Sequence, residues 1–132
     1  MKNVLLIDDD RSHLAVLPVA LSQSGYQVIP KTDAESAVAV LGEKIKIGLI
    51  ILNYEMPGLD ALSFMTVLRV LMPNVPVIVL TRQGNVDIYL KLMSLGAFEY
   101  MSEPFRIAEL RRAVQTAFPG SEQQALSPTC PY

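Results

Sequence analysis

Five short runs rich in valine, isoleucine and leucine recur along the chain, separated by longer stretches in which apolar residues follow helical spacing. The runs are VLLI (4–7), YQVI (26–29), GLIIL (48–52), VPVIVL (75–80) and AFEYM (97–101). Strands that are apolar on both faces and alternate with helices are typical of a parallel sheet covered on both sides. The sequence therefore predicts a three-layer α/β domain of five β-α units over residues 3–118, joined by right-handed crossovers.

The chain is long enough for one domain with its own core, and we expect residues 1–118 to form that domain. Residues 119–132 carry three prolines with serine and glutamine, a composition typical of a flexible tail or the start of a linker. The sequence leaves open whether an output domain follows residue 132. Pro18 lies inside the first helical stretch, where it removes a backbone hydrogen bond and predicts a bend.

The composition excludes several classes of function. The formal net charge is −2, so no basic surface favours direct binding of nucleic acid. Cys130 is the only cysteine, which excludes a disulfide framework and a thiol-based metal site and favours a reducing compartment. No apolar run approaches the roughly 20 residues of a membrane span, and no signal-peptide core follows Met1. We expect a cytoplasmic protein without membrane contact.

Polar side chains follow four of the five predicted strands. They are Asp8, Asp9 and Asp10 after the first, Asn53 after the third, Thr81 after the fourth, and Ser102 and Glu103 after the fifth. In open α/β sheets the ligand site forms beyond the carboxyl ends of the strands, so these groups are expected at one edge. Helix capping explains one aspartate, which we expect to be Asp10. Asp8 and Asp9 are predicted to form an acidic pocket.

Four segments, VLLIDDD, LNYEMPGLDAL, PVIVLT and GAFEYMSEPF, follow one another with characteristic spacing. In this order the chain resembles a response-regulator receiver domain, also called CheY-like, over residues 3–118. The resemblance implies a doubly wound, flavodoxin-like sheet of strand order 2-1-3-4-5. It also implies phosphoryl transfer from a histidine kinase to an aspartate at the end of the third strand.

The same resemblance suggests roles for individual residues. Asp8 and Asp9 match the acidic pair that binds Mg²⁺, and the backbone carbonyl of Glu55 matches a further ligand. Thr81 matches the hydroxyl that contacts the phosphoryl group. Tyr100 matches the aromatic residue that switches rotamer.

Two positions depart from the family pattern. Asn53 stands at the phosphoacceptor position and Glu103 at the position of a lysine. An amide cannot attack phosphorus, and a carboxylate about 5 Å from a phosphate repels it by on the order of 3 kcal/mol at an effective dielectric near 20. We therefore expect a phosphorylation-independent module of two-component signalling that is not an enzyme. The alternative is an active receiver that accepts phosphate on Asp8, Asp9 or Glu55.

The pocket could still hold a cation. Asp8, Asp9 and Glu103 sum to −3, whereas the family's three carboxylates and one ammonium sum to −2. Oxygen atoms of Asp8, Asp9, Asn53 and Glu55 suit Mg²⁺ or Ca²⁺, although neither is required. A pocket without a cation is equally compatible with the sequence. Asn53 would then be structural, with its amide donating to Asp9.

The fourth helix, residues 85–95, carries two apolar stripes. Val86, Leu90 and Met93 form the stripe that we assign to the sheet. Ile88, Leu92 and Leu95 form the second, nearly opposite. Because only one stripe can face the sheet, the second predicts a contact with a protein partner or a homodimer through the surface of helix 4, strand 5 and helix 5. The alternative is that flanking side chains cover it.

His13 is the only histidine and lies near the acidic edge. With no nearby serine or cysteine nucleophile, it is expected to be a surface residue without a catalytic role. A small-ligand site, as in flavin-binding relatives of this fold, is a third alternative for the edge. The absence of a Gly-rich phosphate loop after the first strand disfavours that alternative.

Overall fold

The computed structural model describes residues 2–118; the predicted tail or linker at 119–132 lies outside the described residues. Five strands form one parallel sheet in the order β2-β1-β3-β4-β5. The strands are β1 (Lys2–Ile7), β2 (Tyr26–Lys31), β3 (Ile47–Asn53), β4 (Val77–Thr81) and β5 (Glu99–Ser102). The helices are α1 (Arg11–Ser22), α2 (Ala34–Leu41), α3 (Ala61–Leu71), α4 (Val86–Ser94) and α5 (Ile107–Ala117). The predicted doubly wound fold and its strand order are confirmed.

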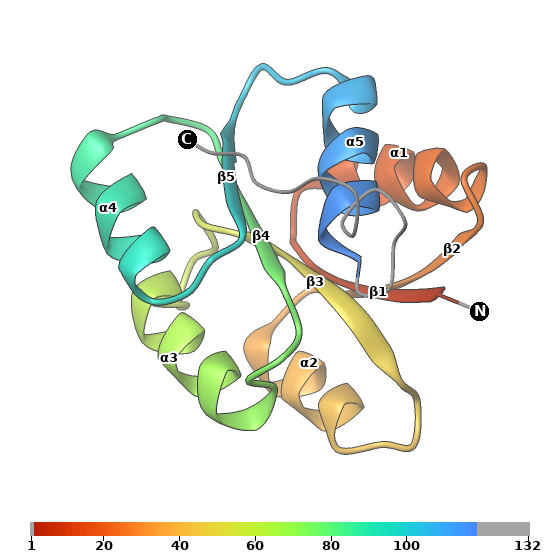
Figure 1. The fold of residues 1–132 in the computed structure, drawn as a ribbon, viewed down its shortest axis with the longest axis horizontal. Coiled ribbons are helices and arrows are strands. Elements are labelled where there is room, and N and C mark those ends of the chain that lie inside the picture. Colours follow the sequence, from red (N-terminus) through yellow and green to blue (C-terminus); the bar gives the residue numbers. More distant parts are fainter. Residues whose placement is uncertain (1, 119–132) are drawn as a thin grey trace.

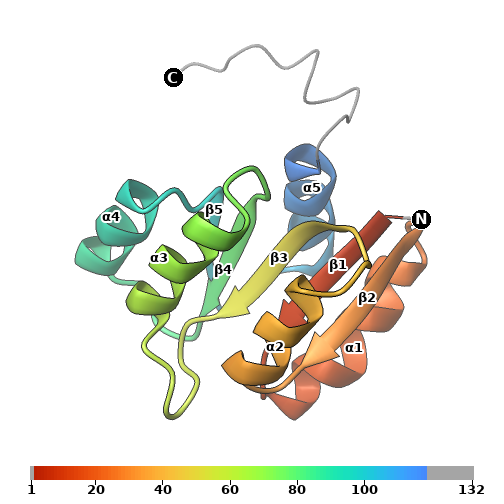
Figure 2. The same cartoon turned by 90° about the horizontal axis from the view of Figure 1, so that it is seen from below.

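The helices cover both faces of the sheet, α1 and α5 on one side and α2, α3 and α4 on the other (Figure 1, Figure 2). Each central strand sends alternate side chains into two separate cores. In β1, for example, Leu5 and Ile7 enter the core under α2 and α3, whereas Val4 and Leu6 enter the core under α1 and α5. This explains why the sequence runs are apolar without alternation.

Four helices begin after an aspartate or asparagine that caps the first turn. Asp10, Asp33, Asp60 and Asn85 each accept a backbone N–H of the first turn with a side-chain oxygen. The capping role expected of Asp10 is confirmed. Helix α1 runs through Pro18 as one element. No helix within residues 2–118 has both the length and the apolar character needed to cross a membrane.

The strand boundaries differ from the predicted ones for local reasons. β4 begins at Val77, after Pro76, because proline has no N–H for the ladder. β2 nevertheless continues through Pro30, since β2 is an edge strand and pairs only with β1. Gly48 in β3 lies against the ring of Phe118, where an added Cβ would stand 2.5 Å from a ring carbon. That close approach explains a glycine inside a central strand.

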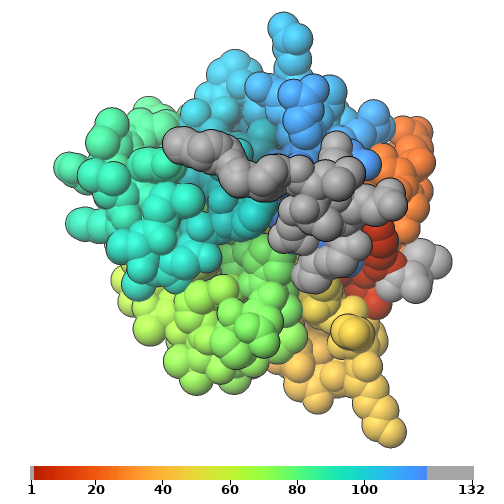
Figure 3. Space-filling model, viewed as in Figure 1, coloured from red at the N-terminus to blue at the C-terminus, as the bar shows by residue number. Residues whose placement is uncertain are grey.

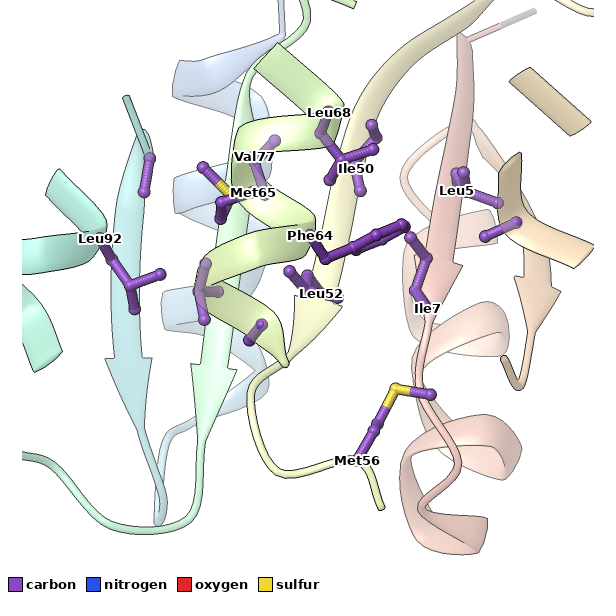
Figure 4. Close-up of a cluster of buried hydrophobic side chains, with 14 of the residues drawn as sticks. Leu5, Ile7, Ile50, Leu52, Met56, Phe64, Met65, Leu68, Val77 and Leu92 are labelled. Carbon is purple, nitrogen blue, oxygen red and sulfur yellow. The ribbon is translucent and has the colours of Figure 1, made fainter. Parts of the chain in front are cut away.

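The sheet-facing side of α4 differs from the predicted one, because only Met93 of the three residues assigned to the sheet packs against the core. Leu92 is fully buried in the core with α3 (Figure 4), and Ile88 and Leu95 pack partly against the same core. Val86 is 73% exposed and Leu90 57%. The prediction that Ile88, Leu92 and Leu95 form the exposed interface stripe is therefore wrong. Packing accounts for this orientation, because Leu92 enters the same core as the buried residues of α3.

Candidate functional site

Asp8 directly follows β1 and is fully buried at the carboxyl edge of the sheet. Its Oδ1 accepts from the amide of Asn53 at 2.9 Å and from the backbone N–H of Asp10 at 2.9 Å. Its Oδ2 accepts from Nδ1 of His13 at 2.7 Å. Asn53, at the end of β3, is thus a donor to Asp8, where the sequence predicted a bond to Asp9. The exposed Asp9 stands outside this network.

His13 joins two carboxylates that lie far apart in the sequence. Nδ1 contacts Asp8, and Nε2 lies 3.1 Å from Oε2 of Glu103, in the loop after β5. Both neighbours are carboxylates, so this pairing favours imidazolium, the form of the ring that donates from both nitrogens. The bond to Asp8 raises the pKa of His13 above its usual value. The expectation of a surface residue is wrong: only 13% of the His13 side chain is exposed.

His13 brings a titratable base into the acidic pocket. When the ring is protonated, its charge together with those of Asp8, Asp9 and Glu103 sums to −2, one less negative than the count from the three carboxylates alone. The helix explains the placement, because α1 begins at Arg11, is capped by Asp10, and directs His13 from its first turn back toward the end of β1. Histidine was the missed residue, and the one available signal was its position five residues after Asp8 at the start of a helix.

Glu55 directs its carboxylate across the edge to the end of β4. One oxygen accepts from the hydroxyl of Thr81, and the other accepts from the backbone N–H of Arg82 at 2.9 Å. Thr81 is buried, and its hydroxyl is also within reach of the Gln83 backbone. A hydroxyl and a backbone N–H that both point to one place form an anion-binding pair. Here the anion is the protein's own side chain.

Tyr100 lies in β5 beside the same edge. Its hydroxyl is buried and lacks a hydrogen-bond partner within residues 2–118, and its ring packs on Tyr89 of α4 with centroids 5.9 Å apart. Thr81 and Tyr100 are on neighbouring strands, but Thr81 pairs with Ser102 and Tyr100 with Val79. The switch roles that the resemblance suggests for these two residues stay predictions.

Two of the four ligands expected for Mg²⁺ or Ca²⁺, Asp8 and Asn53, are already engaged in hydrogen bonds. Asp8 already accepts three hydrogen bonds, and Oδ1 of Asn53 accepts from the backbone N–H of Glu55 at 3.1 Å. A directly bound cation would have to displace these donors. A buried carboxylate that accepts three hydrogen bonds acts as a structural anchor for the strand ends.

Comparison with known proteins places the chain in a family. Residues 4–115 match the model of the response regulator receiver domain. The transcriptional regulatory protein PrrA of Mycobacterium tuberculosis is 35% identical over 133 residues, which cover 95% of this chain and 57% of that protein. This chain therefore spans little more than half the length of that relative.

Two solved structures are also similar. The beryllofluoride-activated NtrC4 receiver domain dimer has a TM-score of 0.82 and 28% identity, covering 89% of this chain and 97% of that chain. A response regulator of Burkholderia pseudomallei was solved with a phosphorylated aspartic acid, calcium ion and citrate. It has a TM-score of 0.77 and 25% identity, and the match covers 95% of this chain and 72% of that chain. With the matched residues, the fold and the strand order in agreement, this chain belongs to the response regulator receiver domain family.

Proposed function

We propose that this receiver domain works without phosphorylation, as a protein-binding module in two-component signalling. The proposal rests on one observation. The hydrogen-bond donors that would hold a phosphoryl group already donate to a carboxylate of the protein itself. Glu55 takes the hydroxyl of Thr81 and the N–H of Arg82. The incoming anion would meet a carboxylate in that place, and like charges in a partly buried site repel strongly.

The acceptor position supports the same proposal. Asn53 is 6% exposed and uses its amide to hold Asp8. A neutral amide bonded in this way offers no anionic oxygen to phosphorus. Glu103 in turn is bonded to His13, so the loop after β5 contributes a carboxylate where a lysine would attract phosphate.

The alternative is an active receiver that accepts phosphate on another acidic residue. The Burkholderia neighbour carries a phosphorylated aspartic acid, which makes this alternative concrete. Asp8 and Glu55 are both engaged in hydrogen bonds, so Asp9, which is exposed, is the carboxylate of the edge that best fits such a role. We rank this alternative second because Glu55 already fills the place beside the Thr81 hydroxyl where a phosphoryl group would be held.

Binding to a partner would use the surface formed by α4, β5 and α5, which Figure 3 displays as neighbouring parts of one face. Val86, Tyr89 and Leu90 are exposed on α4, and Phe98 is exposed just before β5. Two hollows flank β5, one beside Tyr100 and Tyr89 and one along α5. An apolar patch rimmed by polar groups is typical of a contact with a protein or a second copy of the chain. The NtrC4 dimer and the greater length of PrrA make a homodimer and an output domain the leading partners.

The test is exposure of the full chain to acetyl phosphate and Mg²⁺, followed by intact-mass measurement. We expect no phosphorylated species of the wild type. Asn53→Asp combined with Glu103→Lys supplies the missing acceptor and cation, and we expect this double variant alone to gain the mass of one phosphoryl group. Phosphorylation of the wild type to the same extent would refute the proposal, and Asp9→Asn would then locate the acceptor.

A further inference from the structure

Three metal-ligating side chains converge beside the buried Asp8. Asp10 and His13 belong to the start of α1, and Glu103 belongs to the loop between β5 and α5. One ligand atom from each of the three lies within 4.8 Å of the others. All three residues are half-buried, so an ion from solvent can reach them. No other such group of histidine, cysteine and carboxylate residues occurs within the described part of the chain.

A hydrogen bond to Asp8 fixes the orientation of the His13 imidazole. Asp8, which is fully buried, holds Nδ1 at 2.7 Å and is itself held by Asn53 and by the backbone of Asp10. This leaves Nε2 as the atom that faces Glu103, at 3.1 Å. Metal-binding histidines in proteins almost always have their second nitrogen bonded to a carboxylate or carbonyl in this way, because the bond fixes the ring and raises its basicity.

The other two ligands are also positioned. Asp10 uses Oδ1 to cap α1, accepting from the N–H groups of Ser12 and His13, and these bonds hold the carboxylate at the helix start. Glu103 keeps 34% of its side chain exposed. Three carboxylates, those of Asp8, Asp10 and Glu103, act on a single imidazole. These negatively charged groups around the ring attract a divalent cation to this place.

We propose that Asp10, His13 and Glu103 form a binding site for a divalent transition-metal ion of the Zn²⁺ class. One imidazole nitrogen and two carboxylate oxygens are ligands that Zn²⁺ accepts, with water completing the coordination. The ion takes the place of the Nε2 proton that lies between His13 and Glu103, and that proton is released to solvent. Mg²⁺ prefers an all-oxygen, near-octahedral set, so a site centred on imidazole selects against it. The bound ion would tie the start of α1 to the loop after β5.

The site differs from the acidic pair that the family uses for Mg²⁺. Asp8 acts here only as a positioning residue behind the ring, and Asp9 takes no part. The inference is independent of the proposed function, because it needs neither an acceptor at position 53 nor a phosphoryl group. A wild type that accepts phosphate would leave this site untouched, and failure to bind Zn²⁺ would leave the phosphorylation result untouched.

Isothermal titration of the untagged full chain with Zn²⁺ tests the site. Cys130 is replaced by serine in every sample so that no thiol competes for the metal. We expect one ion per chain and a rise in melting temperature on binding. His13→Asn and Glu103→Gln should each weaken binding by about 10-fold to 100-fold or more, since even outer-shell changes have effects of about that size.

Two control variants distinguish Zn²⁺ binding at this site from non-specific attraction of cations to surface carboxylates. Glu43→Gln removes an exposed carboxylate elsewhere, and Asp9→Asn removes one member of the Mg²⁺ pair; neither should change Zn²⁺ affinity by as much as threefold, roughly the scatter of such additive effects. Circular dichroism checks that each variant folds, and the partly exposed Glu103 supplies the test where His13→Asn does not fold. Absence of Zn²⁺ binding overturns the inference, as does binding that depends on Asp9 and is indifferent to Glu103→Gln.

Discussion

At the scale of single residues, the amide of Asn53 has a structural consequence as well as a chemical one. It lies between two strand ends and donates to Asp8, a carboxylate with no exposed surface. A second carboxylate at this position would place two negative charges in a poorly hydrated space. The amide at this position therefore avoids the repulsion that a second carboxylate would bring.

Replacing Asn53 by aspartate should therefore destabilise the protein in metal-free buffer. The change removes the donor to Asp8, and we expect the free energy of unfolding in urea to fall by about 1–3 kcal/mol. Mg²⁺ should restore part of the loss, because a divalent cation can bridge the two carboxylates. Asn85→Asp is the control, since aspartate caps α4 as well as asparagine does. Equal stability of Asn53→Asp and wild type without Mg²⁺ would contradict the role given to the amide.

His13 should make stability depend on pH. The pKa of His13 is raised in the folded state by its bond to Asp8, so the folded state binds the proton more tightly than the unfolded state. The resulting stabilisation is complete below the unfolded pKa of about 6.5 and is lost as pH rises through the higher folded pKa. Urea unfolding at about pH 5.5 and about pH 9 measures it.

The matched variant for this measurement is His13→Asn, which cannot titrate. The wild type should lose more stability than the variant between the two pH values, and the difference between the two proteins isolates His13 from other titrating groups. A variant with the same pH dependence as the wild type would show that the His13 ion pair does not couple to folding.

At the scale of elements, α4 shows what a hydrophobic pattern can and cannot predict. The helix is nine residues long and carries apolar side chains on two sides, so its periodicity predicts a helix without predicting which side faces the sheet. That choice depends on packing against the core that α4 shares with α3, where Leu92 is fully buried, and such tertiary contacts are not visible in a local pattern. Only the existence of an exposed apolar face on α4 followed from the sequence.

Two alanine substitutions test the revised orientation of α4. Leu92→Ala empties a fully buried site and should lower the free energy of unfolding by about 2–5 kcal/mol. Leu90→Ala removes a side chain that is 57% exposed and should change it by less than about 0.5 kcal/mol. Both substitutions replace leucine by alanine, so they change helix propensity by the same amount. The difference in unfolding free energy between the two variants, measured by chemical denaturation, therefore reports the difference in burial. Similar costs for the two variants would mean that α4 is rotated.

At the scale of the whole molecule, the arrangement of elements is readable from the sequence, whereas the contacts at the site are not. Parallel strands must bring their carboxyl ends to one edge, which is why Asp8, Asn53 and Thr81 meet as predicted. The side-chain pairings at that edge depend on rotamers and loop paths. Glu55 turns toward Thr81, and His13 toward Glu103, across segments that no local pattern relates.

The hydrogen bonds of Glu55 at the end of β4 also predict how the whole domain responds to a phosphoryl donor. Because Glu55 already accepts from Thr81 and from the N–H of Arg82, acetyl phosphate with Mg²⁺ should leave amide hydrogen exchange across α4, β5 and α5 of the wild type unchanged. Glu55→Ala should instead speed exchange of the Arg82 amide by about tenfold or more, the effect of losing one hydrogen bond to a charged group.

Glu35→Ala provides the comparison for that experiment, since Glu35 is an exposed carboxylate on α2, remote from the edge. It should leave exchange at Arg82 as in the wild type. Slower exchange in α4 and β5 of the wild type after addition of acetyl phosphate would show that phosphate displaces Glu55. The internal carboxylate would then be a competitor of the phosphoryl group, and the domain a conditional receiver in place of one that has no use for phosphate.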